Sequence, residues 1–175
     1  AAELLSALNR AASLAARQGV LVVASAGNDT ADLDHNKNLI KVPAEVSSIL
    51  SISATGPLGY AYNANNFGRF ASYSNYGSSG VTLAAPGGDD AYLGNENCTM
   101  YLSDGITPLV RPCWVFDMVM STTRGTGAAT TTYGWAAGTS MASPAAAAVA
   151  AMIKQKYPGI SVGDLKNRLR RATDD

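Results

Sequence analysis

One stretch of sequence, Gly138-Thr139-Ser140-Met141-Ala142-Ser143-Pro144, decides the fold of this 175-residue chain. It opens an alanine-rich segment that predicts a buried helix from Ser140 to about Lys156. A serine at a helix N-terminus lies beside unpaired backbone N–H groups and the positive end of the helix dipole, which stabilise developing negative charge. Pro144 removes a helical hydrogen bond, a departure of the kind that gathers at functional sites. The same pattern also fits an ordinary Ser/Thr N-cap before a core helix.

A second segment carries a polar side chain at the end of a strand. Residues 20–24 form a short, β-branched apolar run after Gly19 and predict a buried strand. The run continues into Ser25-Ala26-Gly27-Asn28, where small residues allow another backbone to approach closely and Asn28 supplies an amide donor.

Together, residues 24–28 and 138–144 resemble two motifs of the subtilisin-like serine proteases, the subtilases. In that family the first motif carries the oxyanion-hole asparagine and the second carries the nucleophilic serine. The resemblance therefore assigns these roles to Asn28 and Ser140. It extends over most of the chain through the following segments: residues 42–44, 49–54, 70–77, 81–87 and 161–172.

The periodicity of the remaining segments predicts the fold class. Residues 2–17 carry a helical apolar stripe, and Gly19 stands where a left-handed C-cap is expected. Ser161 and Asp164 have the spacing of a capping box for a last helix. The apolar faces of the two helices are Leu4, Leu5, Leu8, Ala12 and Ala15, and Val162, Leu165, Leu169 and Ala172. The order of elements predicts an α/β fold with a mostly parallel sheet flanked by helices.

The catalytic set that the resemblance implies is incomplete in this chain. A serine hydroxyl needs a base and an orienting acid, which subtilases supply in the order Asp, His, Ser. Residues 1–27 contain neither Asp nor His, and the only histidine, His35, follows Asn28 in a polar segment that we interpret as a solvated loop. We therefore expect residues 1–175 to be the C-terminal part of a subtilisin-like catalytic domain, without its N-terminal strands and its Asp and His segments. Such a chain would be inactive, would expose a strand edge beside residues 1–24, and would associate with itself or with the missing N-terminal part.

Residues 88–117 have no counterpart in the resemblance, and we interpret them as an inserted loop. The loop holds both cysteines, Cys98 and Cys113. A disulfide between them would stabilise the protein by about 3 kcal/mol and would fit a secreted or otherwise extracytoplasmic protein. This loop has too few thiolates and no histidine for a transition-metal site, so no metal ligand is assigned. The chemistry requires no cofactor, although subtilases often bind structural calcium, and this loop offers oxygen atoms on Asp89, Asp90, Asn95, Glu96 and Asn97.

Composition narrows the classes of partner. Thirteen basic and thirteen acidic residues cancel, which gives no electrostatic reason to expect nucleic acid or an anionic membrane. No apolar run reaches the roughly 20 residues that span a bilayer. A hydrophobic content of 47% suits one globular domain.

The resemblance implies a polypeptide substrate and an acyl-enzyme mechanism. Ser140 would attack a peptide carbonyl, and the Asn28 amide with the Ser140 N–H would bind the oxyanion. Thr139 would support the oxyanion site. Ser25, Ala26 and Gly27 would form one wall of the pocket for the substrate residue before the scissile bond, and residues 42–44 its floor.

Two other interpretations compete with a protease. A catalytically dead, subtilase-like binding module would keep the fold and cleft without the base. An unrelated α/β hydrolase would need a Gly-x-Ser-x-Gly elbow. Ala142 occupies the place of the second glycine of that motif, which disfavours the hydrolase.

Overall fold

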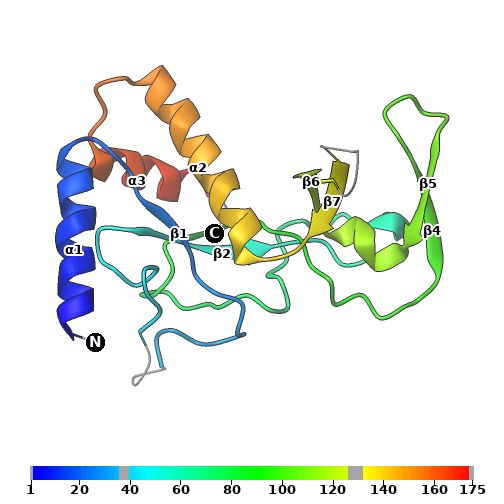
Figure 1. The fold of residues 1–175 in the computed structure, drawn as a ribbon, viewed down its shortest axis with the longest axis horizontal. Coiled ribbons are helices and arrows are strands. Elements are labelled where there is room, and N and C mark those ends of the chain that lie inside the picture. Colours follow the sequence, from blue (N-terminus) through cyan, green and yellow to red (C-terminus); the bar gives the residue numbers. More distant parts are fainter. Residues whose placement is uncertain (1, 36–39, 126–131, 174–175) are drawn as a thin grey trace.

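A parallel sheet of three strands in the order β1-β2-β3 forms the centre of the fold (Figure 1). The computed structural model describes residues 2–35, 40–125 and 132–173. The strands are β1 (Val23–Ser25), β2 (Leu50–Thr55) and β3 (Leu83–Pro86). In the register, Val23 lies opposite Leu50 and Ile52 opposite Leu83. The predicted α/β class with a parallel sheet flanked by helices is therefore confirmed.

Helix α2 (Thr139–Lys156) covers the sheet with alanine side chains. Ala142, Ala146 and Ala150 are at most 5% exposed and belong to one core cluster with Leu50 and Ile52 of β2. Because alanine ends at Cβ, one helical row of alanines lets the helix axis lie close to the sheet. Proline inside the helix does not end it, since α2 continues through Pro144 to Lys156.

Helix α1 (Ala2–Arg17) has the predicted bounds and the predicted cap. Gly19 has φ +76°, and the N–H groups of Gly19 and Val20 donate to the carbonyls of Ala16 and Ala15. This left-handed cap includes Val20, which explains why β1 begins only at Val23 and why Val20 is 54% exposed. Leu4 was predicted to face inward and is 57% exposed, whereas its neighbour Leu5 packs against a core cluster with Ala12.

Helix α3 (Val162–Arg171) begins at the predicted capping box. The Ser161 hydroxyl accepts a hydrogen bond from the Asp164 N–H at 3.1 Å and contacts the Asp164 carboxylate at 2.8 Å. Val162, Leu165 and Leu169 are buried as predicted. Ala172 was placed on this inward face and is exposed, because the helix ends one residue earlier, at Arg171.

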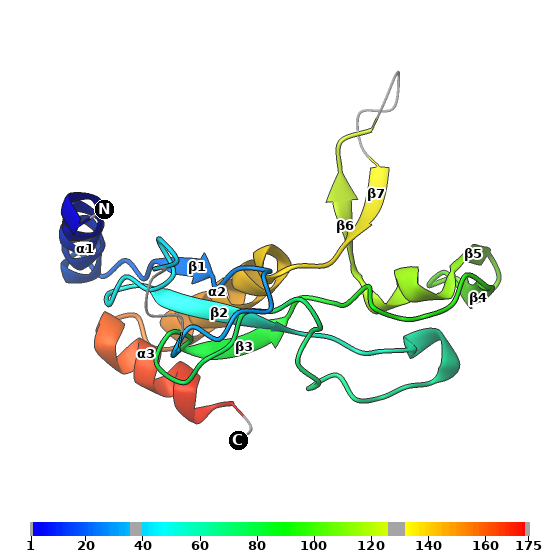
Figure 2. The same ribbon diagram turned by 90° about the horizontal axis from the view of Figure 1, so that it is seen from below.

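Two antiparallel hairpins project from the body at the end opposite α1 (Figures 1 and 2). The first pairs β4 (Asn97–Tyr101) with β5 (Pro108–Pro112), and the second pairs β6 (Val119–Thr123) with β7 (Thr132–Ala136). A 3-10 turn, η2 (Cys113–Asp117), joins them, and another, η1 (Tyr60–Tyr62), packs against it. Residues 88–117, which we interpreted as an inserted loop, contain the first of these hairpins.

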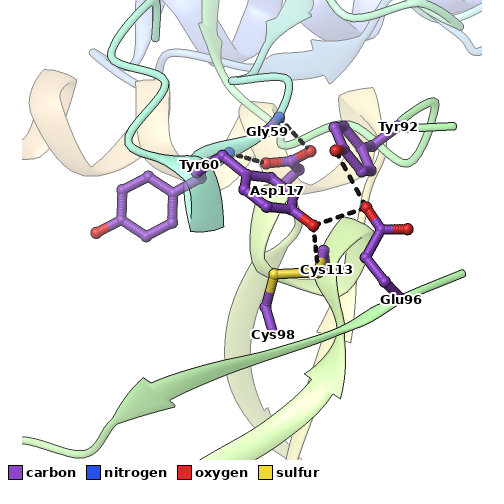
Figure 3. The surroundings of a disulfide bond; sticks show 8 residues. Gly59, Tyr60, Tyr92, Glu96, Cys98, Cys113 and Asp117 are labelled. Atoms are coloured by element: carbon purple, nitrogen blue, oxygen red, sulfur yellow. Dashed lines mark hydrogen bonds between the residues drawn. A yellow bond between two sulfur atoms is a disulfide. The ribbon is translucent and has the colours of Figure 1, made fainter. Parts of the chain in front are cut away.

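The predicted disulfide between Cys98 and Cys113 is confirmed, with Cα atoms 4.8 Å apart (Figure 3). Tyr62 of η1 donates its hydroxyl to Glu96 at 2.7 Å, and the buried Asp117 accepts hydrogen bonds from the Gly59 and Tyr60 N–H groups at 2.8 and 2.7 Å. These contacts fix the base of the first hairpin to the body. Among the described residues, no helix has both the length and the apolar character needed to cross a membrane.

Candidate active site

The carboxyl ends of the parallel strands and the N-terminus of α2 meet in one place. Asn28 follows the end of β1, and Gly87 follows the end of β3. The Gly138 N–H donates to the Gly87 carbonyl at 3.0 Å, which ties the start of α2 to this edge. In open α/β sheets, ligands bind outside the carboxyl ends of the strands, so this edge is the expected place for a functional site.

Ser140 is the second residue of α2 and is exposed. Gly138 is the N-cap, and no side chain caps the helix. The helix therefore begins one residue earlier than predicted, and the interpretation of this motif as an ordinary Ser/Thr N-cap is wrong. No hydrogen bond joins the Ser140 hydroxyl to another described residue, which leaves it available to solvent or substrate beside the helix N-terminus.

Asn28 is held directly against the residue that precedes Ser140. Its Oδ1 accepts hydrogen bonds from the Thr139 N–H at 3.0 Å and from the Thr139 hydroxyl at 2.7 Å. Because both donors take the oxygen, the Nδ2 amide is the part of the side chain that remains to act as a donor. A Cβ at Gly138 would lie 3.3 Å from this Nδ2, so glycine at the N-cap keeps the space beside the amide open.

Gly87 permits the close approach of the two backbones beneath the site. A Cβ there would lie 2.7 Å from the Gly138 carbonyl oxygen and 2.7 Å from the Ala54 Cβ, distances that no side chain could occupy. The Tyr73 hydroxyl donates to the carbonyls of Gly87 and Gly88 at 3.1 and 2.7 Å. Burial, followed by the charge of Asp89, raises the pKa of Tyr73 to about 12, so this hydroxyl keeps its proton and remains a donor.

Asn75 supports the site, although its sequence context did not mark it as a functional residue. It is fully buried, and its Oδ1 accepts hydrogen bonds from the N–H groups of Asp29 and Ala31, each at 2.9 Å. Its Nδ2 donates to the Ala26 carbonyl at 2.8 Å. The side chain thus holds the backbone on both sides of Asn28. The sequence around Asn75 is polar and typical of a turn. Only the burial of Asn75, which the sequence does not show, identifies it as a residue that supports the site.

The four residues that were predicted to contact substrate differ in their exposure to solvent. Ala26 and Thr139 are each 1% exposed, whereas Ser25 and Gly27 are partly exposed. The Thr139 hydroxyl also accepts a hydrogen bond from the Gly27 N–H at 3.2 Å. Thr139 therefore lies behind Asn28 and positions it. Ala26 is too deeply buried to contact a substrate itself, whereas its neighbours Ser25 and Gly27 reach the surface.

His35 lies in the solvated position that we predicted. Its Nδ1 is 2.7 Å from the Asp32 carboxylate, and its side chain is 81% exposed. The hydrogen bond to Asp32 and the charge of that carboxylate raise the pKa of His35. No described contact joins this pair to Ser140.

Two of the carboxylates that were considered for calcium already have protein partners. Asp89 is fully buried and accepts hydrogen bonds from Arg69 and from the N–H and hydroxyl of Ser72. Burial alone would raise the pKa of Asp89, but the hydrogen bonds from Ser72 and from the N–H groups of Asp90 and Ala91 together outweigh it and lower that pKa. Glu96 accepts the Tyr62 hydroxyl. Within the described ranges, no cluster of three or more His, Cys, Asp or Glu side chains is arranged to hold a metal ion.

Comparison with known proteins identifies the family. The model of the subtilase family matches residues 2–175. The chain is 31% identical over 163 residues to M-protease of Shouchella clausii (strain KSM-K16), covering 93% of this chain and 30% of that protein. It is also 31% identical over 163 residues to Subtilisin BL of Lederbergia lenta, covering 93% of this chain and 42% of that protein.

Solved structures agree with this match. A protease from Pseudoalteromonas arctica PAMC 21717 superimposes with a TM-score of 0.66 at 29% identity, covering 95% of this chain and 40% of that one. A lanthipeptide protease superimposes with a TM-score of 0.69 at 25% identity, covering 98% of this chain and 48% of that one. The chain therefore belongs to the subtilase family. It spans less than half the length of these relatives.

Proposed function

We propose that this chain supplies the nucleophile and the oxyanion donor of a subtilisin-type serine endopeptidase. One observation carries the proposal: the Asn28 side chain is hydrogen-bonded to Thr139, directly before the exposed Ser140, through its oxygen alone. This arrangement leaves the Nδ2 amide and the Ser140 N–H as donors beside the hydroxyl that would attack.

In this proposal Ser140 attacks the carbonyl carbon of a peptide bond and forms an acyl-enzyme. The carbonyl oxygen becomes an oxyanion, which the Asn28 Nδ2 and the Ser140 N–H stabilise. A base must take the serine proton, and later protonate the leaving amine. His35, the only histidine of the chain, is paired with Asp32 and makes no described contact with Ser140. The base and its acid therefore come from outside these 175 residues.

The partner that we propose is the rest of the catalytic domain. Helix α2 buries Ala142, Ala146 and Ala150 against the sheet, yet Val149 and Met152 of the same helix are 42% and 60% exposed. A helix that is apolar around its circumference is normally buried on both sides. Strand β1 also has a neighbour on one side only, β2, among the described strands. An open strand edge and an apolar face recruit another polypeptide.

Sedimentation equilibrium of the isolated chain at micromolar concentration tests this partner. We expect self-association, and we expect Met152→Glu, placed on the exposed face of α2, to weaken it. Asn167→Glu, at an exposed position of α3, adds the same single negative charge and is the control. A stable wild-type monomer with cooperative unfolding would contradict the proposal.

The disulfide and the similarity to M-protease support an extracytoplasmic location, which we include in the proposal. We propose no calcium site in residues 88–117, because protein donors already bind Asp89 and Glu96.

Activity is tested on the longest open reading frame that contains these codons. We expect a fluorophosphonate probe to label Ser140 and the Ser140→Ala variant to be unlabelled and inactive. Loss of one oxyanion donor costs subtilisin about 10²–10³ in kcat, and we carry that magnitude over to Asn28→Leu. Asn66→Leu, in an exposed loop, is the matched control.

The 175-residue chain alone should react with the probe no faster than its Ser140→Ala variant. Rapid labelling of Ser140 in the isolated chain would refute the external base. If the protein encoded by the longer open reading frame neither reacts with the probe nor cleaves peptides, the protease hypothesis is wrong and the catalytically dead binding module is favoured.

A further inference from the structure

A cavity of about 750 Å³ lies between the two hairpins. Its walls come from both hairpins and carry mainly aromatic, methionine and leucine side chains. We call it the hairpin groove, and its principal residues are Met100, Tyr101, Arg111, Met120, Tyr133 and Trp135.

Large side chains in the hairpin groove remain open to solvent. Tyr101 is 63% exposed, Met120 53% and Tyr133 65%. Exposed apolar patches of this kind mark interaction surfaces. The base of the first hairpin is fixed by the Cys98–Cys113 disulfide (Figure 3) and by the Tyr62–Glu96 hydrogen bond. One wall of the groove is therefore anchored before anything binds.

Arg111 is the one charged residue among those that line the groove. Its guanidinium carbon lies 5.5 Å from the centre of the Trp135 ring, and its Nη1 donates to the Val110 carbonyl at 2.7 Å. In the described part of the chain, no carboxylate forms an ion pair with Arg111. An arginine that stacks on an aromatic ring and has donors left over is well suited to bind a carboxylate.

A short segment of chain connects the groove to the candidate active site. Strand β7 forms part of its wall and ends at Ala136, three residues before α2 begins at Thr139. In both ribbon views, β1 lies on one side of the start of α2 and the hairpins lie on the other (Figures 1 and 2). A polypeptide that passes Ser140 with its acyl side beside residues 25–27 would therefore continue toward the hairpins.

We propose that the hairpin groove binds the substrate polypeptide on the carboxyl side of the scissile bond and favours apolar or aromatic residues next to an acidic one. This inference rests on the proposed protease function. The chain between Trp135 and Ser140 reaches at most about 17 Å, and an extended substrate advances about 3.3 Å per residue. Contacts with Trp135 therefore fall at most about five residues beyond the bond that is cut, and contacts with the rest of the groove fall farther along the substrate.

Binding is measured first, without catalysis, on the 175-residue chain. The probe is a fluorescein-labelled peptide, Gly-Gly-Phe-Leu-Asp-Phe-Gly, and two matched peptides carry Lys in place of Asp or only Gly and Ser. We expect the acidic peptide to bind at least tenfold more tightly than either control. In a Trp114→Phe background Trp135 is the only tryptophan, and its emission should change on binding.

Charge reversal separates recognition from misfolding. Arg111→Glu should reverse the preference, so that the Lys peptide binds at least tenfold more tightly than the Asp peptide. Trp135→Ala should weaken binding of the Asp peptide at least tenfold. Arg170→Glu, on α3 at the other end of the molecule, is the matched charge control and should change nothing (Figure 1).

Equal binding of the three peptides, or an unchanged peptide preference in Arg111→Glu, would refute the proposal that the hairpin groove binds substrate. So would a dimer that Trp135→Ala dissociates, because a second copy would then be the occupant. Catalysis is scored separately on the open reading frame. Arg111→Glu should lower kcat/KM for peptides that extend eight residues past the scissile bond and spare substrates that end in p-nitroanilide. Peptide binding without any cleavage would refute the proposed protease function and support the peptide site in the hairpin groove. Cleavage without peptide binding would support the protease function and refute the peptide site.

Discussion

Replacing Thr139 with valine tests how Asn28 is positioned. The Thr139 hydroxyl is buried, donates to the Asn28 Oδ1 at 2.7 Å and accepts from the Gly27 N–H at 3.2 Å. Valine has nearly the same shape but puts a methyl group in place of this hydroxyl. The substitution leaves the Gly27 N–H without its acceptor, while Asn28 keeps only the backbone donor of residue 139.

The structure sets the size and the order of the effects. A partly buried N–H without a partner and one lost hydrogen bond together cost about 2 kcal/mol. In a domain of this size that loss lowers Tm by about 4–8 °C. Thr139→Ser keeps the hydroxyl and loses one buried methyl, which costs about 0.8 kcal/mol. We therefore expect wild type to be more stable than Thr139→Ser, and Thr139→Ser more stable than Thr139→Val.

Urea unfolding of the three proteins measures this order. Hydrophobic burial alone predicts the opposite, with valine at least as stable as threonine and serine the weakest. The Asn28 side-chain amide resonances should move in Thr139→Val and return in Thr139→Ser. Thr173→Val is the control, because that exposed hydroxyl bonds only the Arg170 carbonyl in the last turn of α3. A valine variant as stable as wild type would refute the positioning role.

Three further predictions concern other parts of the molecule. The Cys98→Ser/Cys113→Ser double variant should lose about 3 kcal/mol in urea unfolding under oxidising conditions, and wild type should lose the same amount when it is reduced. A variant that loses clearly more than reduced wild type would contradict a simple cross-link. The His35 pKa should lie above 6.5 by NMR titration and fall in Asp32→Asn; because the folded-state pKa is raised, the pair stabilises the fold below the unfolded pKa, and this contribution disappears as pH rises through the folded one. Asp89→Asn should cost about 3 kcal/mol, the low end for a broken buried pair because the arginine partner is 30% exposed. Since the folded pKa of Asp89 is lowered, its contribution is present above the unfolded pKa of 3.8 and is lost as pH falls through the folded value, so an unfolding free energy independent of pH between 2 and 5 would argue against it.

Local patterns in the sequence predicted the helices accurately. The bounds of α1, its left-handed cap at Gly19 and the capping box at Ser161 all follow from residues within a few positions of one another. Strand β1 was predicted too early, because the cap of α1 uses the Val20 N–H. The family was also within reach of the sequence, since residues 24–28 and 138–144 are specific motifs. The hairpin in residues 97–112 was not predicted, because its two short strands mix polar and apolar residues without a regular alternation and are ordered by their pairing with each other.

The contacts that form the site could not be predicted from local sequence patterns. Asn28 and Ser140 were candidates from their motifs, but the bond from the Thr139 hydroxyl to Asn28 joins residues 111 positions apart. Likewise, Asn75 and Asp89 are ordinary polar residues in the sequence and become fully buried supports in the fold.

The sequence by itself therefore determined the helices, the family and the disulfide, for which it offers a single pair of cysteines. The tertiary structure alone decided which polar groups meet. The physical reason is that helix and strand patterns depend on neighbouring residues, whereas a site forms where parallel strands end at one edge. At that edge, burial forces each polar group to find a partner from a distant part of the chain.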